Sequence, residues 1–124
     1  MTIRDVYEKM GADYDAVLRR LPSEALIGKL LLKFPADDCF PTLKAALDNH
    51  DAETAFRAVH TLKGVSQNLG FDNLYPPAHD LTEALRGRTL EGSGELFPLV
   101  EQQYEITIRA IREYEAALSQ NPAE

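Results

Sequence analysis

The chain has 124 residues, 44% of them hydrophobic and 27% charged, which suits one domain with a single modest core. Its formal net charge of −7 argues against general nucleic-acid binding, and no apolar run approaches the ~20 residues of a membrane helix. The N-terminus does not resemble a signal peptide, and a single cysteine, Cys39, cannot form an internal disulfide, so we expect a cytoplasmic protein.

The first half of the sequence predicts helices separated by short breaks. Helical patterns cover residues 12–21, 22–34 and 39–49, and in the second of these apolar side chains recur every four residues. Pro35 is expected to end the second helix, because proline does not continue a helix. His50 follows the third helix in a polar turn, where a surface role is expected.

A longer helix is predicted over residues 52–69. Asp51 precedes it and is a suitable N-cap, because its carboxylate can accept the backbone N–H groups that the first turn leaves unpaired. Gly70 follows it and is a typical C-terminal stop.

The remaining sequence predicts two more helices. One begins after Pro76 and Pro77, since proline lacks a backbone N–H, and ends near Gly87. Residues 88–94 are expected to form a loop. Apolar side chains at three- and four-residue steps then mark a long terminal helix over residues 96–118.

These elements predict an all-α fold, with no convincing pair of strands. We expect an antiparallel four-helix bundle with one or more additional short N-terminal helices. A single domain is expected over residues 1–124. Because the sequence begins with Met and shows no obvious linker, we expect a free-standing module.

The stretch AVHTLKGVSQNLGF, residues 58–71, contains the main candidate for chemistry. At about 100° per residue, one helix face gathers its apolar side chains on the side opposite His60. The residues of that apolar face are Ala58, Leu62, Val65 and Leu69. His60 is therefore predicted to be accessible, whereas a lone histidine is more often a hydrogen-bonded part of a core.

Two neighbours on the same helix suit chemistry at His60. A neutral imidazole offers a nucleophilic nitrogen near physiological pH. Lys63, three residues later, lies on the same face and can offset incoming negative charge. Gly64 would leave open space beside the ring, although glycine costs about 0.5–1 kcal/mol of helix stability relative to alanine. The alternative explanation for Gly64 is a close crossing of two helices.

The segment HTLKGVSQNLG resembles the signature of the histidine-containing phosphotransfer (HPt) domain family, and the helical layout agrees over roughly residues 13–118. The resemblance implies that His60 accepts a phosphoryl group from an aspartyl phosphate on a response-regulator receiver domain and passes it on or returns it. It also implies that Lys63 stabilises phosphohistidine and that Gly64 admits the phosphate and the partner.

The resemblance further sets expectations for cofactors and partners. The chain is expected to bind no cofactor or metal itself, and Mg²⁺ is expected on the receiver domain. The sequence has no glycine-rich nucleotide loop, so we expect a phosphocarrier without its own kinase domain. Receiver domains are the expected partners, a hybrid histidine kinase is a further candidate, and a monomer is favoured because His60 needs access.

Many family members carry a glutamine on the following helix that orients the histidine ring, and this sequence does not. At the comparable place it has Thr82, whose hydroxyl is one candidate for that contact. Gln67 is another, because it lies on the His60 face.

Phe56 also maps near His60, and two roles are open for it. Either it contributes an apolar patch for a receiver, or it packs against the N-terminal helix and seals the bundle, which we favour. Arg57 and Gln67 are candidates for the rim of the docking surface.

Two alternative functions remain open from the sequence. One is a helical adaptor that binds a receiver or another helical partner without being phosphorylated. The other is a metal-binding bundle built around His79 and Glu83, which are one turn apart on a helix. A pair of ligands is weak evidence for a metal, so a solvated pair is favoured.

Cys39 is expected to be partly buried.

Overall fold

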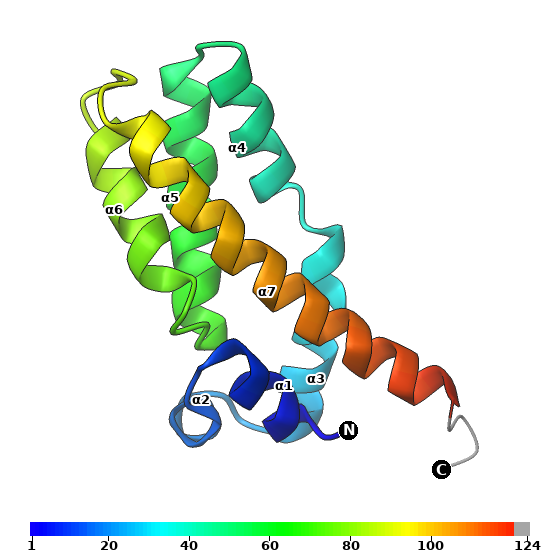
Figure 1. Cartoon of the computed structure of the whole chain (residues 1–124). Helices are drawn as coiled ribbons and strands as arrows, with labels where there is room; N and C mark the ends of the chain where they lie inside the picture. Colours follow the sequence, from blue (N-terminus) through cyan, green and yellow to red (C-terminus); the bar gives the residue numbers. More distant parts are fainter. Residues whose placement is uncertain (121–124) are drawn as a thin grey trace.

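The computed structural model describes residues 1–120, and all of their regular structure is helical (Figure 1). The helices are α1 (Ile3–Met10), α2 (Tyr14–Arg20), α3 (Glu24–Lys33), the short 3-10 helix η1 (Phe34–Ala36), α4 (Cys39–Asp48), α5 (Ala52–Leu69), α6 (Tyr75–Leu85) and α7 (Ser93–Gln120). The all-α prediction is confirmed. Residues 121–124 of the predicted domain lie outside the described residues.

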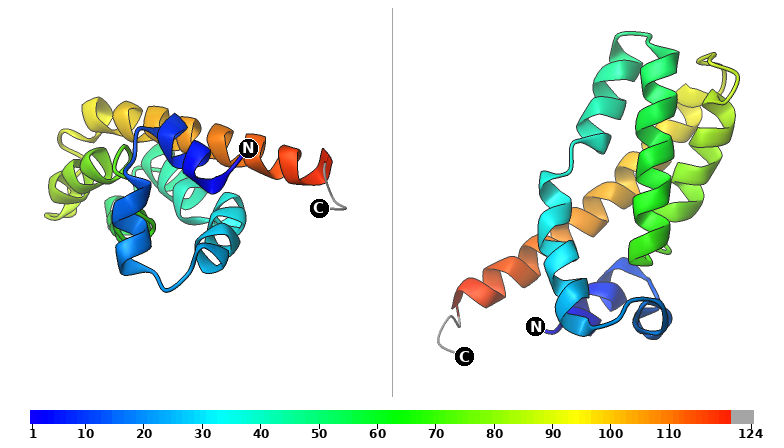
Figure 2. Two further views of the ribbon diagram at one scale, coloured as in Figure 1. Left: turned by 90° about the horizontal axis from the view of Figure 1, so that it is seen from below. Right: turned by 180° about the vertical axis from the view of Figure 1, so that it is seen from behind.

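Helices α4 to α7 form an antiparallel four-helix bundle (Figures 1 and 2). Each of them packs against the next in chain order. α7 is the longest helix and crosses the bundle obliquely, so that its C-terminal part extends beyond α5 and α6 toward α1 and α3. The bundle and its additional short N-terminal helices agree with the predicted architecture.

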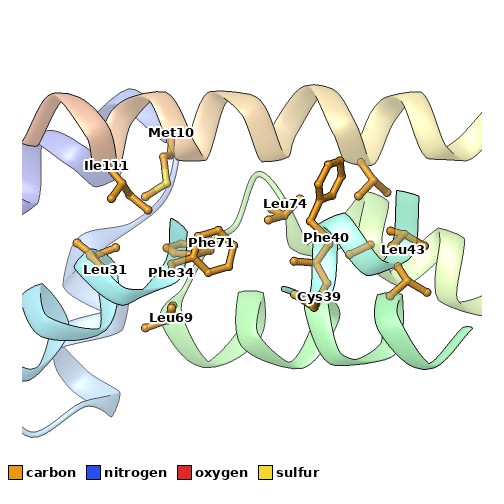
Figure 3. Close-up of a cluster of buried hydrophobic side chains, with 14 of the residues drawn as sticks. Met10, Leu31, Phe34, Cys39, Phe40, Leu43, Leu69, Phe71, Leu74 and Ile111 are labelled. Carbon is orange, nitrogen blue, oxygen red and sulfur yellow. The ribbon is translucent and has the colours of Figure 1, made fainter. Parts of the chain in front are cut away.

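Aromatic side chains fill the middle of the core, where α4, η1 and the α5–α6 turn meet α7 (Figure 3). The ring of Phe40 stacks on that of Tyr104 with centroids 3.9 Å apart. The rings of Phe34 and Phe71 meet edge to face at 5.1 Å. Such pairs add to the hydrophobic gain of burial. Because Phe34 also pairs with Tyr104, at 5.8 Å, these contacts join α4, η1 and the α5–α6 turn to α7.

Helix α1 has no predicted range in the sequence, but local signals explain it. The hydroxyl of Thr2 accepts a hydrogen bond from the Asp5 N–H, and the Asp5 carboxylate accepts one from the Thr2 N–H. This capping box starts the helix. Gly11 then ends it in the left-handed conformation, at φ 82°.

Two predicted boundaries were wrong. α6 begins at Tyr75 and includes Pro76 and Pro77 in its first turn, where a missing N–H costs no helical hydrogen bond. α7 begins at Ser93, inside the segment expected to be a loop. Pro35 does end the second predicted helix: α3 stops at Lys33, and Pro35 lies in the first turn of the 3-10 helix η1 that follows.

Candidate functional site

The helix that carries His60 has the predicted bounds, because both of its ends are set locally. The Asp51 carboxylate accepts a hydrogen bond from the Thr54 N–H at 3.1 Å. Gly70 ends α5 at φ 70°, and a Cβ at this position would collide with Val17. The position therefore requires glycine for both its conformation and its space.

His60 is exposed, as predicted, but it lies at the edge of the buried face and not opposite its centre. Leu62 is fully buried, whereas Val65 is only partly covered. The buried face of α5 is wider than predicted and consists of Ala55, Phe56, Ala58, Val59, Leu62, Ser66 and Leu69. Burial of Val59 and Phe56 places the core directly beside the imidazole on one side.

The space around His60 is asymmetric along the helix axis. Side chains on an α-helix lean toward its N-terminus, so the His60 ring lies over the turn that carries Phe56. The two ring centroids are 5.8 Å apart with a 38° angle between the planes. A side chain at position 64 would lean back over His60 for the same reason. Gly64 removes that side chain and leaves one side of the ring open.

Gly64 does not mark a helix crossing. A Cβ built on it meets no heavy atom within 4 Å, apart from its chain neighbours and the backbone of its own helix. This excludes a close crossing of two helices as the reason for Gly64. What the glycine provides is open space next to His60.

Lys63 is half-buried on the side of α5 that faces α6. The pKa of the Glu83 carboxyl is lowered, first by its hydrogen bond from Arg86 and to a lesser degree by the charges of Arg86, His79 and Lys63. The Lys63 charge is therefore close enough to α6 to act on Glu83.

Arg86 and Arg88 complete the surroundings of Phe56, and Arg57 shares a glutamate partner with Arg88. The Arg88 guanidinium lies over the Phe56 ring, 4.0 Å from its centroid, and Arg86 approaches the same ring at 5.6 Å. Arg88 Nε also donates to Glu53 Oε2 at 2.8 Å, and Arg57 donates to the other oxygen of the same carboxylate at 2.9 Å. These hydrogen bonds, the one from Arg88 first, lower the pKa of Glu53.

Phe56 is therefore not an exposed apolar patch, and that reading was wrong. Its exposure is 9%, and Arg88 and Arg86 cover it, not the N-terminal helix. Sequence reasoning missed Arg86 and Arg88. Their only signal was the pair of arginines flanking Gly87, and nothing in it shows that this turn folds back over α5.

The two candidates for orienting His60 lie in different surroundings. Thr82 is fully buried, and its hydroxyl donates to the Ala78 carbonyl of its own helix at 2.7 Å. The hydroxyl therefore has no second proton to donate to His60, which does not favour Thr82 as the residue that orients the ring. Gln67 is exposed on α5. Within residues 1–120 no protein group donates to or accepts from a ring nitrogen of His60.

The other candidate residues lie away from any assembled site. Among the described residues, no group of three or more histidine, cysteine, aspartate or glutamate side chains could hold a metal ion. The His79 ring stacks on Tyr75 with centroids 6.0 Å apart, one turn from Glu83. Cys39 is buried, and burial raises the pKa of its thiol. His50 is exposed in the α4–α5 turn, as expected.

The family model of the Hpt domain matches residues 33–120, which include η1 and the whole α4–α7 bundle. The chain belongs to the Hpt domain family. Hpt domains are phosphocarrier modules of two-component signalling, not kinases, and they act together with receiver domains. Helices α1 and α2 and nearly all of α3 precede the matched region.

Comparisons with curated proteins and with solved structures gave no match. Within residues 1–120, no helix combines the length and the apolar character needed to cross a membrane.

Proposed function

We propose that this Hpt domain carries a phosphoryl group on His60, exchanging it with an aspartate of a response-regulator receiver domain. The observation that carries the proposal is the exposed His60 ring with open space over Gly64 on the same helix face. Phosphoryl transfer depends mainly on positioning and charge stabilisation, and an open surface with a lysine on the same helix face suits it.

The proposed transfer conserves atoms and electrons without an oxidant or reductant. The lone pair of His60 Nε2 attacks the phosphorus of the receiver's aspartyl phosphate, and an N–P bond forms. The P–O bond to the aspartate breaks, and the carboxylate leaves with the electron pair. The Nδ1 proton stays on the ring during transfer and is then released to water. Lys63 offsets the charge of the phosphoryl oxygens.

The proposal divides the work between two proteins. Mg²⁺ would be held by the acidic pocket of the receiver, and this chain would bind no cofactor. The chain would act as a monomer, because the His60 face must remain open to one receiver after another. Its proposed location is the cytoplasm. A hybrid histidine kinase is a candidate source of phosphate.

The experiment is phosphate transfer from a panel of phosphorylated receiver domains to the wild type and to His60→Gln. Acid-labile, alkali-stable label on the wild type and none on the variant is the expected result. The chain's other two histidines, His50 and His79, provide matched controls, so His50→Gln and His79→Gln should accept label normally. Receiver binding without label on any variant would favour the non-phosphorylated adaptor.

A further inference from the structure

The orientation of the His60 ring is the starting point. No hydrogen bond from the described residues fixes its nitrogens, yet its ring lies 5.8 Å from that of Phe56, within the range of aromatic pairs. Because the histidine side chain leans toward the N-terminus of α5, this contact blocks one side of the ring. The opposite side is open above Gly64.

Phe56 is itself immobilised. Only 9% of it is exposed, and one guanidinium lies 4.0 Å from its ring centroid and another 5.6 Å away. A cation over an aromatic face is attracted by the ring quadrupole, more strongly where water is excluded. Phe56 therefore offers His60 a fixed surface, unlike an exposed side chain.

Arg88, the closer of the two cations, is held by three contacts. It stacks on Phe56, its Nε donates to Glu53, and its Nη1 donates to the Arg86 carbonyl at 2.6 Å. Its backbone has φ 58°, which is uncommon for a residue other than glycine. A residue keeps such a conformation when its surroundings enforce it. The α6–α7 turn is thereby shaped to place the guanidinium on Phe56.

We infer that Phe56, clamped by Arg88, is the positioning residue that orients the His60 imidazole for phosphoryl transfer, in place of a hydrogen-bond acceptor. The inference rests on the proposed function and assigns neither residue a contact with phosphate. A fixed aromatic wall on one side restricts the tilt of the ring and leaves its other side free for the receiver's phosphoryl group. This restriction is established before the partner binds, which lowers the entropic cost of the reactive geometry.

The first test compares Phe56→Leu with the wild type in single-turnover transfer from a phosphorylated receiver. Loss of an aromatic contact should lower the maximal rate by roughly two- to tenfold, with the half-saturating receiver concentration unchanged. Arg88→Gln should act in the same direction. Phe97→Leu is the control, because Phe97 pairs with Phe40 at a similar centroid distance, 5.7 Å, in the α4–α7 interface. That variant should lose stability without a change in the maximal rate.

A rise in the half-saturating concentration at an unchanged maximal rate would instead place Phe56 in receiver docking and overturn the inference. Equal rate losses in Phe56→Leu and Phe97→Leu would overturn it too, since a general loss of stability would then explain both.

The second test does not depend on phosphate. NMR should show the His60 ring protons displaced by the ring current of Phe56, with exposed His50 as the internal reference. In Phe56→Leu the displacement should disappear while the His50 signals stay in place. Identical His60 signals in both proteins would overturn the inference. Failure of every receiver to label the wild type would count against the proposed function alone, because the NMR result is independent of it.

Discussion

The hydroxyl of Tyr7 donates a hydrogen bond to the backbone carbonyl of Leu69 at 2.6 Å, and both groups are buried. Leu69 is the last residue of α5, and the carbonyls at a helix end lack partners within the helix. Helix α1, which lies before the region matched by the Hpt family, therefore completes the end of the helix that carries His60.

Tyr7→Phe is expected to destabilise the protein by about 1 kcal/mol, because it leaves a buried carbonyl without its donor. Urea denaturation monitored by circular dichroism measures the change. Phosphate transfer to His60 should remain normal under conditions in which the variant is folded. Wild-type stability in this variant would show that this hydrogen bond contributes little to the end of α5.

Much of the site helix was predictable because its determinants are local. Asp51 and Gly70 fixed the ends of α5, and the three- and four-residue spacing of apolar side chains placed His60 outside the core. The bundle followed from similar signals in the other helices. Pro76 and Pro77 were misleading, since proline disrupts the interior of a helix but is accepted in its first turn.

The surroundings of His60 were less predictable because they depend on contacts between distant segments. Arg88 reaches Glu53 across 35 positions of sequence, and only the fold of the α6–α7 turn brings them together. A helical wheel places Phe56 near His60, but it does not show that two guanidiniums cover that ring. Thr82 appeared available from its position, whereas its hydroxyl is committed to Ala78.

Leu62→Ala tests the assignment of the buried face of α5. Leu62 is fully buried, so the variant should lose about 2–5 kcal/mol of unfolding free energy through lost apolar contact and a residual cavity. Leu99, which is 50% exposed on α7, is the matched control. Leu99→Ala should change stability by less than about 0.5 kcal/mol. Equal effects of the two substitutions would contradict the assigned core.

Lys63→Ala should slow phosphate transfer to His60 or shorten the lifetime of phosphohistidine, by roughly tenfold for the loss of one charge-assisted contact. The fold should stay largely intact. Lys44→Ala removes the same charge from α4, where the lysine pairs with Glu101 at 2.9 Å, and should leave transfer unchanged. If both variants slow transfer equally, net charge and not local stabilisation is responsible.

Two substitutions at Gly64 should separate stability from access. Gly64→Ala should stabilise the helix by about 0.5–1 kcal/mol and retain transfer, because the added Cβ meets no atom within 4 Å. Gly64→Gln should leave the protein folded but slow transfer, since its side chain leans toward His60. Thr61→Gln is the control. It places the same side chain at an exposed position next to His60 in the sequence, but at a different angle around the helix axis. Rapid transfer by Gly64→Gln would mean that the open space is not needed.

Glu53→Gln tests the ion pairs that hold Arg88, through their dependence on pH. Hydrogen bonds from Arg88 and Arg57 lower the pKa of Glu53 in the folded protein. Its contribution to stability is therefore fully present above the ordinary glutamate pKa of about 4.3 and is lost as the pH falls through the lowered folded value. Glu53→Gln should be less stable than the wild type at neutral pH, and the difference should shrink at about pH 3.

Urea denaturation at both pH values measures this difference in stability, with Glu95→Gln on the surface of α7 as the control. A difference that stays constant between the two pH values would show that the carboxylate charge does not hold Arg88 in place.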